Sequence, residues 1–455
     1  MNHDARAWAE GHRTFFEDRL RTLVELPTVS MDPTRTPETE ACAEAALALI
    51  RHFGGTATLL RVGGKPYVHG RFGDPSRPSV LLYNHLDVQP ADEPEWKGEP
   101  FRMRVDGERY LGRGATDDKG PALTCLLAVA HAARRGSTLG FQLLWEFEEE
   151  VGSPHFAELL RDQGALFGDV RAVLVSDTLW VSADQPSMDV GLRGFQGVLF
   201  KLRTAEVDAH SGVVGGGAPN PIAGLVRVLA ACFDASTGRI LVPGVRDGIT
   251  PVSDAELDLY LKSGFDLERF RATYGFRRLL SDDPRELLRR LWTEPTFEIH
   301  GISGGYHGPG IKSIVPAWAE AKVSLRLVPG QTGARVVESI QRFVAGLDPL
   351  VEVVGLGSAP AFVTSLDAPE CKAMDRAAQR VLGKGLAVTR GGGSIPAVAM
   401  MAEALRAPVL LMGLSLPEHG YHAPNEFFDW TQARRGVELY ASWFEELERL
   451  PTYGR

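Results

Sequence analysis

The stretch Val80-Leu81-Leu82-Tyr83-Asn84-His85-Leu86-Asp87-Val88 predicts a short buried strand that ends in polar residues. Consecutive apolar residues are typical of a strand that is covered on both faces of a sheet. In open α/β sheets, a polar turn directly after such a strand lies at the carboxyl edge, where sites are built. We therefore expect His85 and Asp87 at the functional edge of an α/β sheet.

The same pattern occurs twice more along the chain. The apolar run at 141–147 leads into three glutamates at 148–150, and the run at 172–175 leads into Asp177. Strands that alternate with helices predict a mostly parallel sheet with right-handed crossovers. Because the carboxyl ends of parallel strands share one edge, these acids and His85 should lie together if their strands are neighbours.

A glycine-rich stretch at 112–120 carries two adjacent carboxylates, Asp117 and Asp118. An ordinary solvated turn is one interpretation of this stretch. The other is a metal site, since carboxylates this close repel one another unless a cation or a proton neutralises them. The other polar residues at strand ends favour the metal site.

The pattern of apolar residues in the sequence changes near residue 191 and changes back near residue 360. Residues 194–204 alternate like an antiparallel strand, without the long apolar runs of a buried parallel sheet. We expect an α/β fold with a mostly parallel-sheet catalytic domain at 1–190 and 360–455. A smaller α+β domain at 191–359 is inserted into it.

Two other stretches have helical patterns. Apolar residues at helical spacing predict one amphipathic helix over about 4–26. Residues 234–295 form a charged, helical, proline-interrupted stretch, for which the sequence indicates no role.

Composition limits the classes of function. A chain of 455 residues is too long for one compact core, and its hydrophobic content of 44% is ordinary for a soluble protein. A net charge of −9 without a basic run argues against nucleic acid or an anionic membrane as partner. No signal peptide or membrane-spanning stretch is evident, and the four scattered cysteines are typical of core thiols in a cytoplasmic protein.

The polar residues that the pattern brings together suit a metal centre. Two imidazoles and several carboxylates without a thiolate suit zinc, manganese or cobalt. The number of ligands exceeds what one ion needs, which favours two ions that share a bridging carboxylate, with a spare carboxylate to take a proton from water. The candidates are His85, Asp87, Asp117, Asp118, Glu149, Glu150, Asp177 and His422.

Four of these stretches, at 84–90, 112–121, 148–153 and 176–177, resemble the motifs of the M20 metallopeptidases. The resemblance is greatest to the cytosolic nonspecific dipeptidase and carnosinase branch, and it covers almost the whole chain. The resemblance assigns roles to individual residues. It implies that His85 and Asp177 bind one metal and that Glu150 and His422 bind the other. Asp117 would bridge both ions, and the family has a cis peptide between this residue and Asp118. Glu149 would be the general base, and Asp87 would orient His85.

The resemblance also implies substrate contacts in and near the inserted domain, which the family uses as a lid and for dimerisation. His210 would stabilise the oxyanion across the dimer interface, and Arg326 would grip the substrate carboxylate. Ser313 stands where the family has a substrate-contacting threonine, and Ser394 lies in a substrate loop. The plainer alternatives are a surface ion pair for Arg326 and a flexible glycine turn for the loop around Ser394.

One position departs from the branch. The dipeptidases usually carry glutamate, near the amino end of the substrate, where this chain has Gly391. The sequence therefore does not predict strict recognition of a free N-terminal amine.

The sequence as a whole predicts a metal-dependent hydrolase that cleaves the amide bond of dipeptides with two divalent ions, zinc first and manganese or cobalt as alternatives. The chain would act as a cytoplasmic homodimer through its inserted domain. An N-acyl- or N-carbamoyl-amino-acid amidohydrolase is the alternative on the same scaffold. A metal-binding protein without catalytic activity, which serves dimerisation or interaction, is the alternative from another class.

Overall fold

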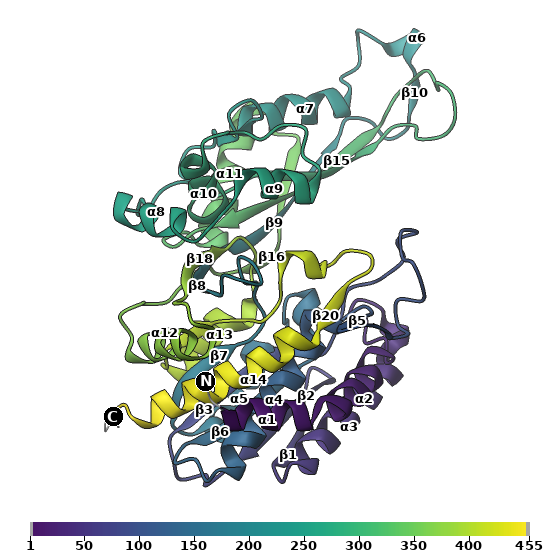
Figure 1. Ribbon diagram of the computed structural model, residues 1–455. Coiled ribbons are helices and arrows are strands. Elements are labelled where there is room, and N and C mark those ends of the chain that lie inside the picture. Colours follow the sequence, from purple (N-terminus) through teal and green to yellow (C-terminus); the bar gives the residue numbers. More distant parts are fainter. Residues whose placement is uncertain (1–2, 452–455) are drawn as a thin grey trace.

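The computed structural model describes residues 3–451, and its strands form two main sheets (Figure 1). The larger sheet has nine strands. Their order is β1 (Thr56–Val62), β2 (Lys65–Phe72), β6 (Gly140–Glu146), β3 (Ser79–His85), β7 (Val170–Val175), β19 (Val409–Leu411), β8 (Ser187–Leu192) and β17 (Phe362–Val363), and β18 (Ala387–Gly391) also pairs with β8. The four strands β6, β3, β7 and β19 are parallel to one another, and antiparallel pairs flank them.

Strand β3 shows why this sheet is buried on both faces. All seven of its residues are buried. Val80 and Leu82 point into one apolar core, and Leu81 and Tyr83 into another. Alternate side chains of a strand point to opposite faces, so an unbroken apolar run requires a layer of helices on each side.

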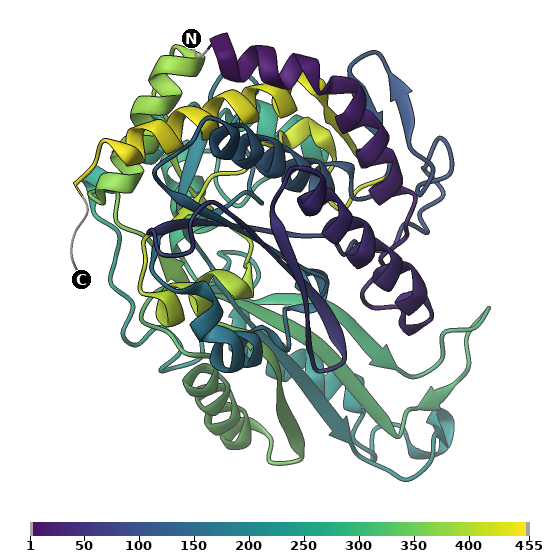
Figure 2. The ribbon, with the colours of Figure 1, turned by 90° about the horizontal axis from the view of Figure 1, so that it is seen from below.

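The helices supply these two layers. One layer lies side by side over the first face (Figure 2). It consists of α1 (His3–Gly11), α2 (Arg13–Val24), α3 (Thr36–His52), α4 (Gly120–Arg134), α12 (Pro369–Leu382) and α14 (Trp430–Glu448). The other face is covered by α5 (Phe156–Phe167) and α13 (Pro396–Leu405).

The single helix expected over 4–26 is wrong. The chain forms α1 and α2, which break at Gly11 and His12. Gly11 costs helix stability, and the His12 imidazole donates from Nδ1 to the carbonyl of Trp8 at 2.7 Å, which gives that helical carbonyl a partner outside the backbone ladder.

The smaller sheet is antiparallel and lies at one end of the molecule (Figure 1). Its order is β13 (Glu298–Gly304), β15 (Trp318–Leu327), β9 (Gly194–Arg203) and β16 (Val351–Ala359). Helices α7 (Pro221–Cys232) and α11 (Gly333–Leu347) pack on it around a separate apolar core. An α/β fold with an inserted smaller α+β part is therefore confirmed.

Three short helices precede β13 in the chain. They are α8 (Asp254–Leu261), α9 (Leu267–Tyr274) and α10 (Pro284–Thr293), and all lie in the charged stretch of unassigned role. Leu257, Tyr260 and Leu288 form a small apolar core with Val190 of β8. The charged stretch is thus anchored to the larger sheet beside β8 and β18.

The remaining strands are short. A three-stranded sheet consists of β4 (Arg104–Asp106), β5 (Arg109–Leu111) and β20 (Phe427–Asp429), and β11 (Phe233–Asp234) pairs with β12 (Arg239–Ile240). At the far end of the smaller sheet, β10 (Ala209–His210), α6 (Ser211–Val214) and β14 (Ile314–Val315) form a projecting tip (Figure 1). No helix within residues 3–451 is long and apolar enough to cross a membrane.

Candidate metal centre

The carboxyl ends of neighbouring strands bring the predicted polar residues together. His85 is the last residue of β3, Glu149 and Glu150 follow β6 in a 3-10 turn, and Asp177 follows β7. Because β6, β3 and β7 are adjacent, these side chains meet at one edge of the sheet. His422 reaches the same place from the segment between β19 and β20.

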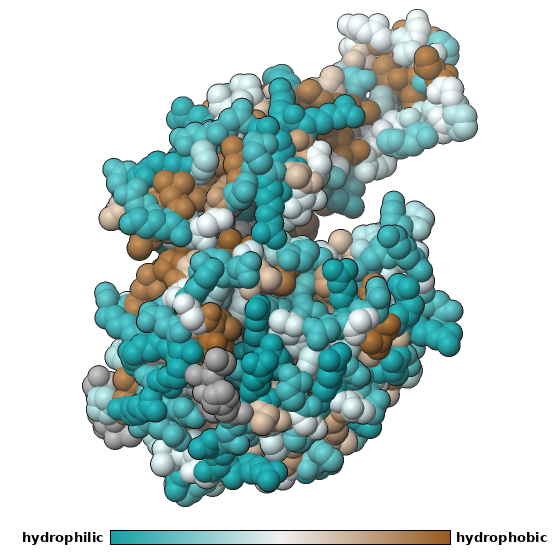
Figure 3. Space-filling view, in the orientation of Figure 1, coloured by the Kyte–Doolittle hydropathy of each residue, from teal (hydrophilic) through white to brown (hydrophobic). Residues whose placement is uncertain are grey.

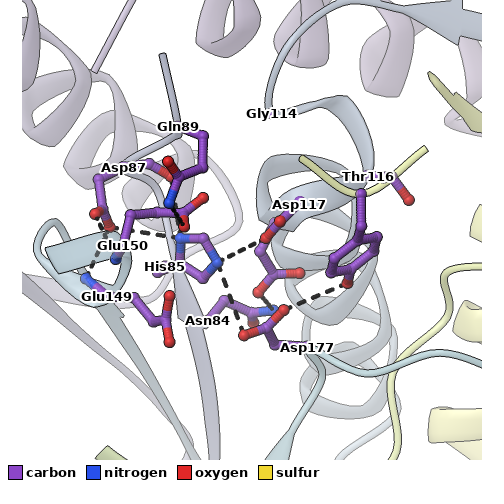
Figure 4. Close-up of polar contacts among 12 residues, drawn as sticks. Asn84, His85, Asp87, Gln89, Gly114, Thr116, Asp117, Glu149, Glu150 and Asp177 are labelled. Atoms are coloured by element: carbon purple, nitrogen blue, oxygen red, sulfur yellow. Dashed lines mark hydrogen bonds and ion pairs between the residues drawn. The ribbon is translucent and has the colours of Figure 1, made fainter. Parts of the chain in front are cut away.

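Asp117 lies beside His85 (Figure 4) and also contacts His422. Its Oδ1 is 3.0 Å from Nε2 of His85, and its Oδ2 is 3.0 Å from Nε2 of His422. His85 Nε2 is also 3.7 Å from Oδ2 of Asp177, and His422 Nε2 is 3.2 Å from Oε2 of Glu150. One carboxylate thus separates two half-sites, each with one imidazole and one further acid.

The donor set fits divalent cations. Ligand atoms of His85, Asp118 and Asp177 lie within 4.8 Å of one another, and so do those of Asp117, Glu150 and His422. Oδ1 of Asp118 is buried without a hydrogen-bond partner among the described residues, although Asn84 donates to its Oδ2 at 2.7 Å. Imidazole and carboxylate ligands without thiolate suit zinc, manganese and cobalt alike.

Burial dominates the electrostatics of this cluster. It raises the pKa of Glu149, of Asp177 and of Asp118 well above the usual carboxyl value. Burial lowers the pKa of His422, but its contacts with Asp117 and Glu150 outweigh this and raise the pKa to about 11. The cluster therefore holds protons that divalent cations would replace, since metal ligands must be deprotonated.

Asp87 holds the two glutamates as well as His85. Its carboxylate accepts hydrogen bonds from the backbone N–H of Glu149 at 3.2 Å and of Glu150 at 3.0 Å. The Nδ1 of His85 donates to the backbone carbonyl of Asp87 at 3.0 Å and is 3.4 Å from its Oδ1. One buried acid thus fixes the turn after β6 against the end of β3.

Glu426, which the sequence analysis did not identify, anchors the loop that carries Asp117. Its carboxylate accepts from the backbone N–H groups of Gly114 at 3.0 Å, Thr116 at 2.9 Å and Asp117 at 3.2 Å. Arg113 donates to it at 2.8 Å. The peptide bond between Asp117 and Asp118 is cis. A lone glutamate more than 300 residues away in the sequence carries no motif that would reveal this contact.

Comparison with known proteins identifies the family. Residues 81–446 match peptidase family M20/M25/M40. The chain belongs to this family. It is 33% identical to human Beta-Ala-His dipeptidase over an alignment of 389 residues. This alignment covers 83% of this chain and 76% of that protein. It is 31% identical to the Cys-Gly metallodipeptidase dug1 of Schizosaccharomyces pombe over an alignment of 454 residues. This alignment covers 95% of each of the two chains.

Solved structures agree. The di-peptidase Dug1p of Saccharomyces cerevisiae matches with a TM-score of 0.88 and 28% identity over 99% of both chains. Human carnosine dipeptidase 1 matches with a TM-score of 0.85 and 28% identity over 99% of this chain. The resemblance found in the sequence is confirmed, and the protein is a metallopeptidase of the M20 family.

A pocket of about 510 Å³ opens from the metal centre of this M20 peptidase. Asp117, Glu149, Asp177 and His422 line one end. The three-helix segment supplies an apolar wall, which consists of Phe265, Phe270, Tyr274, Leu291 and Trp292. The stretch to which the sequence assigned no role therefore encloses the space where a substrate would lie.

The glycine loop at 391–393 forms another wall of this pocket. Ser394, which follows the loop, accepts a hydrogen bond from Nη1 of Arg326 at 2.9 Å and donates to the carbonyl of Arg193 at 2.5 Å. Within residues 3–451, Arg326 forms no ion pair, so the interpretation as a surface ion pair is wrong. Two of the predicted substrate residues, Arg326 and Ser394, contact each other.

His210 and Ser313 do not reach the metal centre within one chain. Both lie exposed in the projecting tip, where the backbone N–H of Ser211 donates to the carbonyl of Ser313 at 2.9 Å. The space-filling view shows this tip standing clear of the larger part of the molecule (Figure 3).

Replacement of Glu426 tests the anchoring of the loop. Glu426→Gln should weaken binding of Zn²⁺ or Mn²⁺ by about 10- to 100-fold although Glu426 does not lie in either half-site, because partners that orient metal ligands typically contribute this much. Competition with a chelating dye at neutral pH measures the Kd. Glu418→Gln, at a half-exposed position, is the matched control. An unchanged Kd in the Glu426 variant would contradict the anchoring role.

Proposed function

We propose that this metallopeptidase is a dipeptidase with two divalent metal ions. The position of Asp117, 3.0 Å from the Nε2 atom of each histidine, is the observation that carries the proposal. It suits a carboxylate shared between two ions. The relatives that match over most of their length are dipeptidases, which favours dipeptides over N-acyl- or N-carbamoyl-amino acids as substrates.

In this proposal, His85 and Asp177 hold one ion, Glu150 and His422 hold the other, and Asp117 bridges them. Bound divalent cations supply polarisation of the scissile carbonyl and acidification of a water molecule. Zinc is the first expectation, with manganese or cobalt as alternatives. Cation charge would also compensate the repulsion among the buried acids.

Glu149 is proposed as the general base. It lines the pocket beside the ligands but belongs to neither half-site. Its carboxylate would take the proton of the attacking water and pass it to the leaving amine. Asp87, which accepts from the N–H of Glu149 and of Glu150, would keep the base and its neighbouring ligand in place.

Arg326 and Ser394 are proposed to bind the carboxylate of the leaving amino acid. The guanidinium of Arg326 donates to Ser394, which lines the pocket, and it forms no ion pair with a carboxylate of the described residues, although the charge of Glu298 acts on it at longer range. A planar guanidinium suits bidentate binding of a substrate carboxylate. This arrangement would exclude longer peptides, whose next residue would occupy that space.

His210 and Ser313 are proposed to act across a homodimer, where His210 would stabilise the oxyanion and Ser313 would contact the substrate. The ten-residue strand β15 separates their tip from Arg326, and a strand rises about 3.3 Å per residue. One chain therefore cannot bring both ends of this strand to one small substrate. The tip exposes Val213 at 81% and Ile311 at 96%, which suits contact with a second subunit.

The exposed edge strand β13 also suits a dimer interface. Ile299 and Ile302 on this strand and Val226 on α7 are exposed. We assign the dimer contacts and the lid to residues 191–359, and the metal centre to residues 1–190 and 360–455. Four buried cysteines, all unpaired, support a reducing and therefore cytoplasmic location.

A substrate panel tests the dipeptidase proposal. The enzyme loaded with zinc or with manganese should hydrolyse dipeptides such as Ala-Ala with a higher kcat/KM than N-acetyl- or N-carbamoyl-alanine. Release of the free amino acid measures each reaction. Preferential hydrolysis of an acylated amino acid would overturn the proposal, and bound metal without any hydrolysis would favour a protein without catalytic activity.

Glu149→Gln tests the base. The variant should retain both ions and lose at least about 100-fold in kcat, because the amide cannot accept the proton of water. Metal analysis and dipeptide turnover are measured on the same preparation, with Glu158→Gln on α5 as the control. Turnover near that of the unmodified enzyme would remove Glu149 from the base role.

Complementation tests the dimer. His210→Ala and Glu149→Gln should each have little activity alone. Co-expression should restore about a quarter of the unmodified activity, because half of randomly assorted dimers then hold one complete site. His210→Ala co-expressed with the double variant is the control that contains no complete site. No recovery in the mixed dimer would show that His210 does not act in trans.

A further inference from the structure

Asp189 is a buried acid in the pocket to which no role has been assigned above. It lies on β8, is 8% exposed and lines the same pocket as Glu149 and His422. No lysine, arginine or histidine within residues 3–451 forms an ion pair with it. A buried carboxylate without a cationic partner is costly unless a proton or a ligand neutralises it. Burial accordingly raises the pKa of Asp189 to about 7.

Thr389 supplies a second polar group beside it. The two residues are direct neighbours in the parallel pairing of β8 and β18. Thr389 is 6% exposed and lines the pocket, and its side chain faces Asp189, where hydrogen bonding by the hydroxyl favours the charged carboxylate. The acid and the hydroxyl therefore form one polar pair at the pocket wall.

Gly391 lies next to Asp189 across the two strands. A Cβ atom placed on Gly391 would lie 3.6 Å from Oδ2 of Asp189 but only 2.5 Å from Cδ2 of Leu192, which fills the space that glycine leaves. Any side chain at position 391 would therefore begin beside this carboxylate. Glycine adds nothing there, so the acid at this point of the pocket comes from β8 and not from the loop.

Strand β8 contains an acid, Asp189, and is followed directly by a cation, Arg193. Arg193 follows the strand four residues after Asp189, and a strand rises about 3.3 Å per residue. Arg193 contacts the carbonyl of Gly392 at 3.0 Å and lies beside Ser394, the partner of Arg326. Arg390 also lines the pocket but is paired with Glu256. The pocket therefore carries the cation Arg193 beyond the glycine loop and the acid Asp189 before it. A substrate with a carboxylate at one end and an ammonium group at the other matches this polarity.

We propose that Asp189, with the Thr389 hydroxyl, binds the cationic amino group on the acyl half of the substrate. The assignment rests on the dipeptidase function proposed above. An ammonium group supplies the cationic partner that the Asp189 carboxylate lacks. It can donate one hydrogen bond to this carboxylate and another to the hydroxyl oxygen of Thr389. Asp189 is then a specificity-determining residue: it selects substrates with a free amine over acylated amino acids.

Substrate pairs that differ only in the amine test this assignment. Alanyl-alanine and propionyl-alanine have the same acyl skeleton, with and without the amino group. β-Alanyl-alanine and 4-aminobutanoyl-alanine place the amine one and two methylene groups further from the scissile bond. For the unmodified holoenzyme, kcat/KM should be highest for one of the amine-bearing substrates. Equal values for alanyl-alanine, its two longer analogues and propionyl-alanine would overturn the assignment without any substitution.

Asp189→Asn removes the charge and keeps the shape. It should lower kcat/KM for the preferred amine-bearing substrate by about 10- to 100-fold, the range of a charge-assisted hydrogen bond, and leave propionyl-alanine unchanged. The matched control is Asp184→Asn, an exposed acid outside this pocket, which should change neither substrate.

The outcomes separate this assignment from the dipeptidase function. Equal losses for both substrates in Asp189→Asn would indicate a structural role and overturn the assignment, as would an unchanged ratio. In either case the unmodified enzyme would still cleave dipeptides. Failure of the unmodified enzyme to cleave any dipeptide would instead overturn the dipeptidase function, and the amine-binding role with it.

Discussion

The structure depends on the burial of several carboxylates at one edge of a parallel sheet. Asp117, Asp118, Asp177 and Glu150 each have an oxygen within 4.8 Å of an imidazole nitrogen, and their side chains are buried, so water screens their repulsion weakly. Such a cluster is stable only if protons or cations compensate it. Burial and the neighbouring acids also raise the pKa values of Glu149 and Asp177, which means that these carboxyl groups hold protons more tightly than usual. Binding of divalent cations would therefore be coupled to the folding of this edge.

A second set of contacts holds these ligands where repulsion would separate them. Asp87 fixes the turn after β6 through two backbone N–H groups, and Glu426 fixes the loop before α4 through three. Both acids are buried, and neither carboxylate belongs to a half-site. Each carboxylate accepts hydrogen bonds from backbone N–H groups, which cannot rotate away as side chains can. The geometry of Asp117 and Glu150 is thereby set by the backbone.

The sequence predicted the parts of this molecule that follow from local patterns. Apolar runs that end in polar residues located His85, Glu149, Glu150 and Asp177, because strand order and strand direction place such ends together. It missed Glu426 and Asp189, because a single acid acquires meaning only from distant chain segments that fold against it. The break at Gly11 and His12 was missed for a related reason: helical spacing of apolar residues continues across a break that one side-chain hydrogen bond stabilises.

Chemistry and recognition are distributed differently over this fold. The proposed metal ligands come mainly from the ends of the central parallel strands, where any displacement would disturb all of them together. The pocket beyond them is built from the peripheral strands β8 and β18, the glycine loop and the three-helix segment. These elements touch the ligands little, so substitutions at Asp189 or Gly391 can change which substrate end groups fit without altering the cation sites. A fold of this kind can keep one hydrolytic centre while its specificity changes at the edge of the sheet.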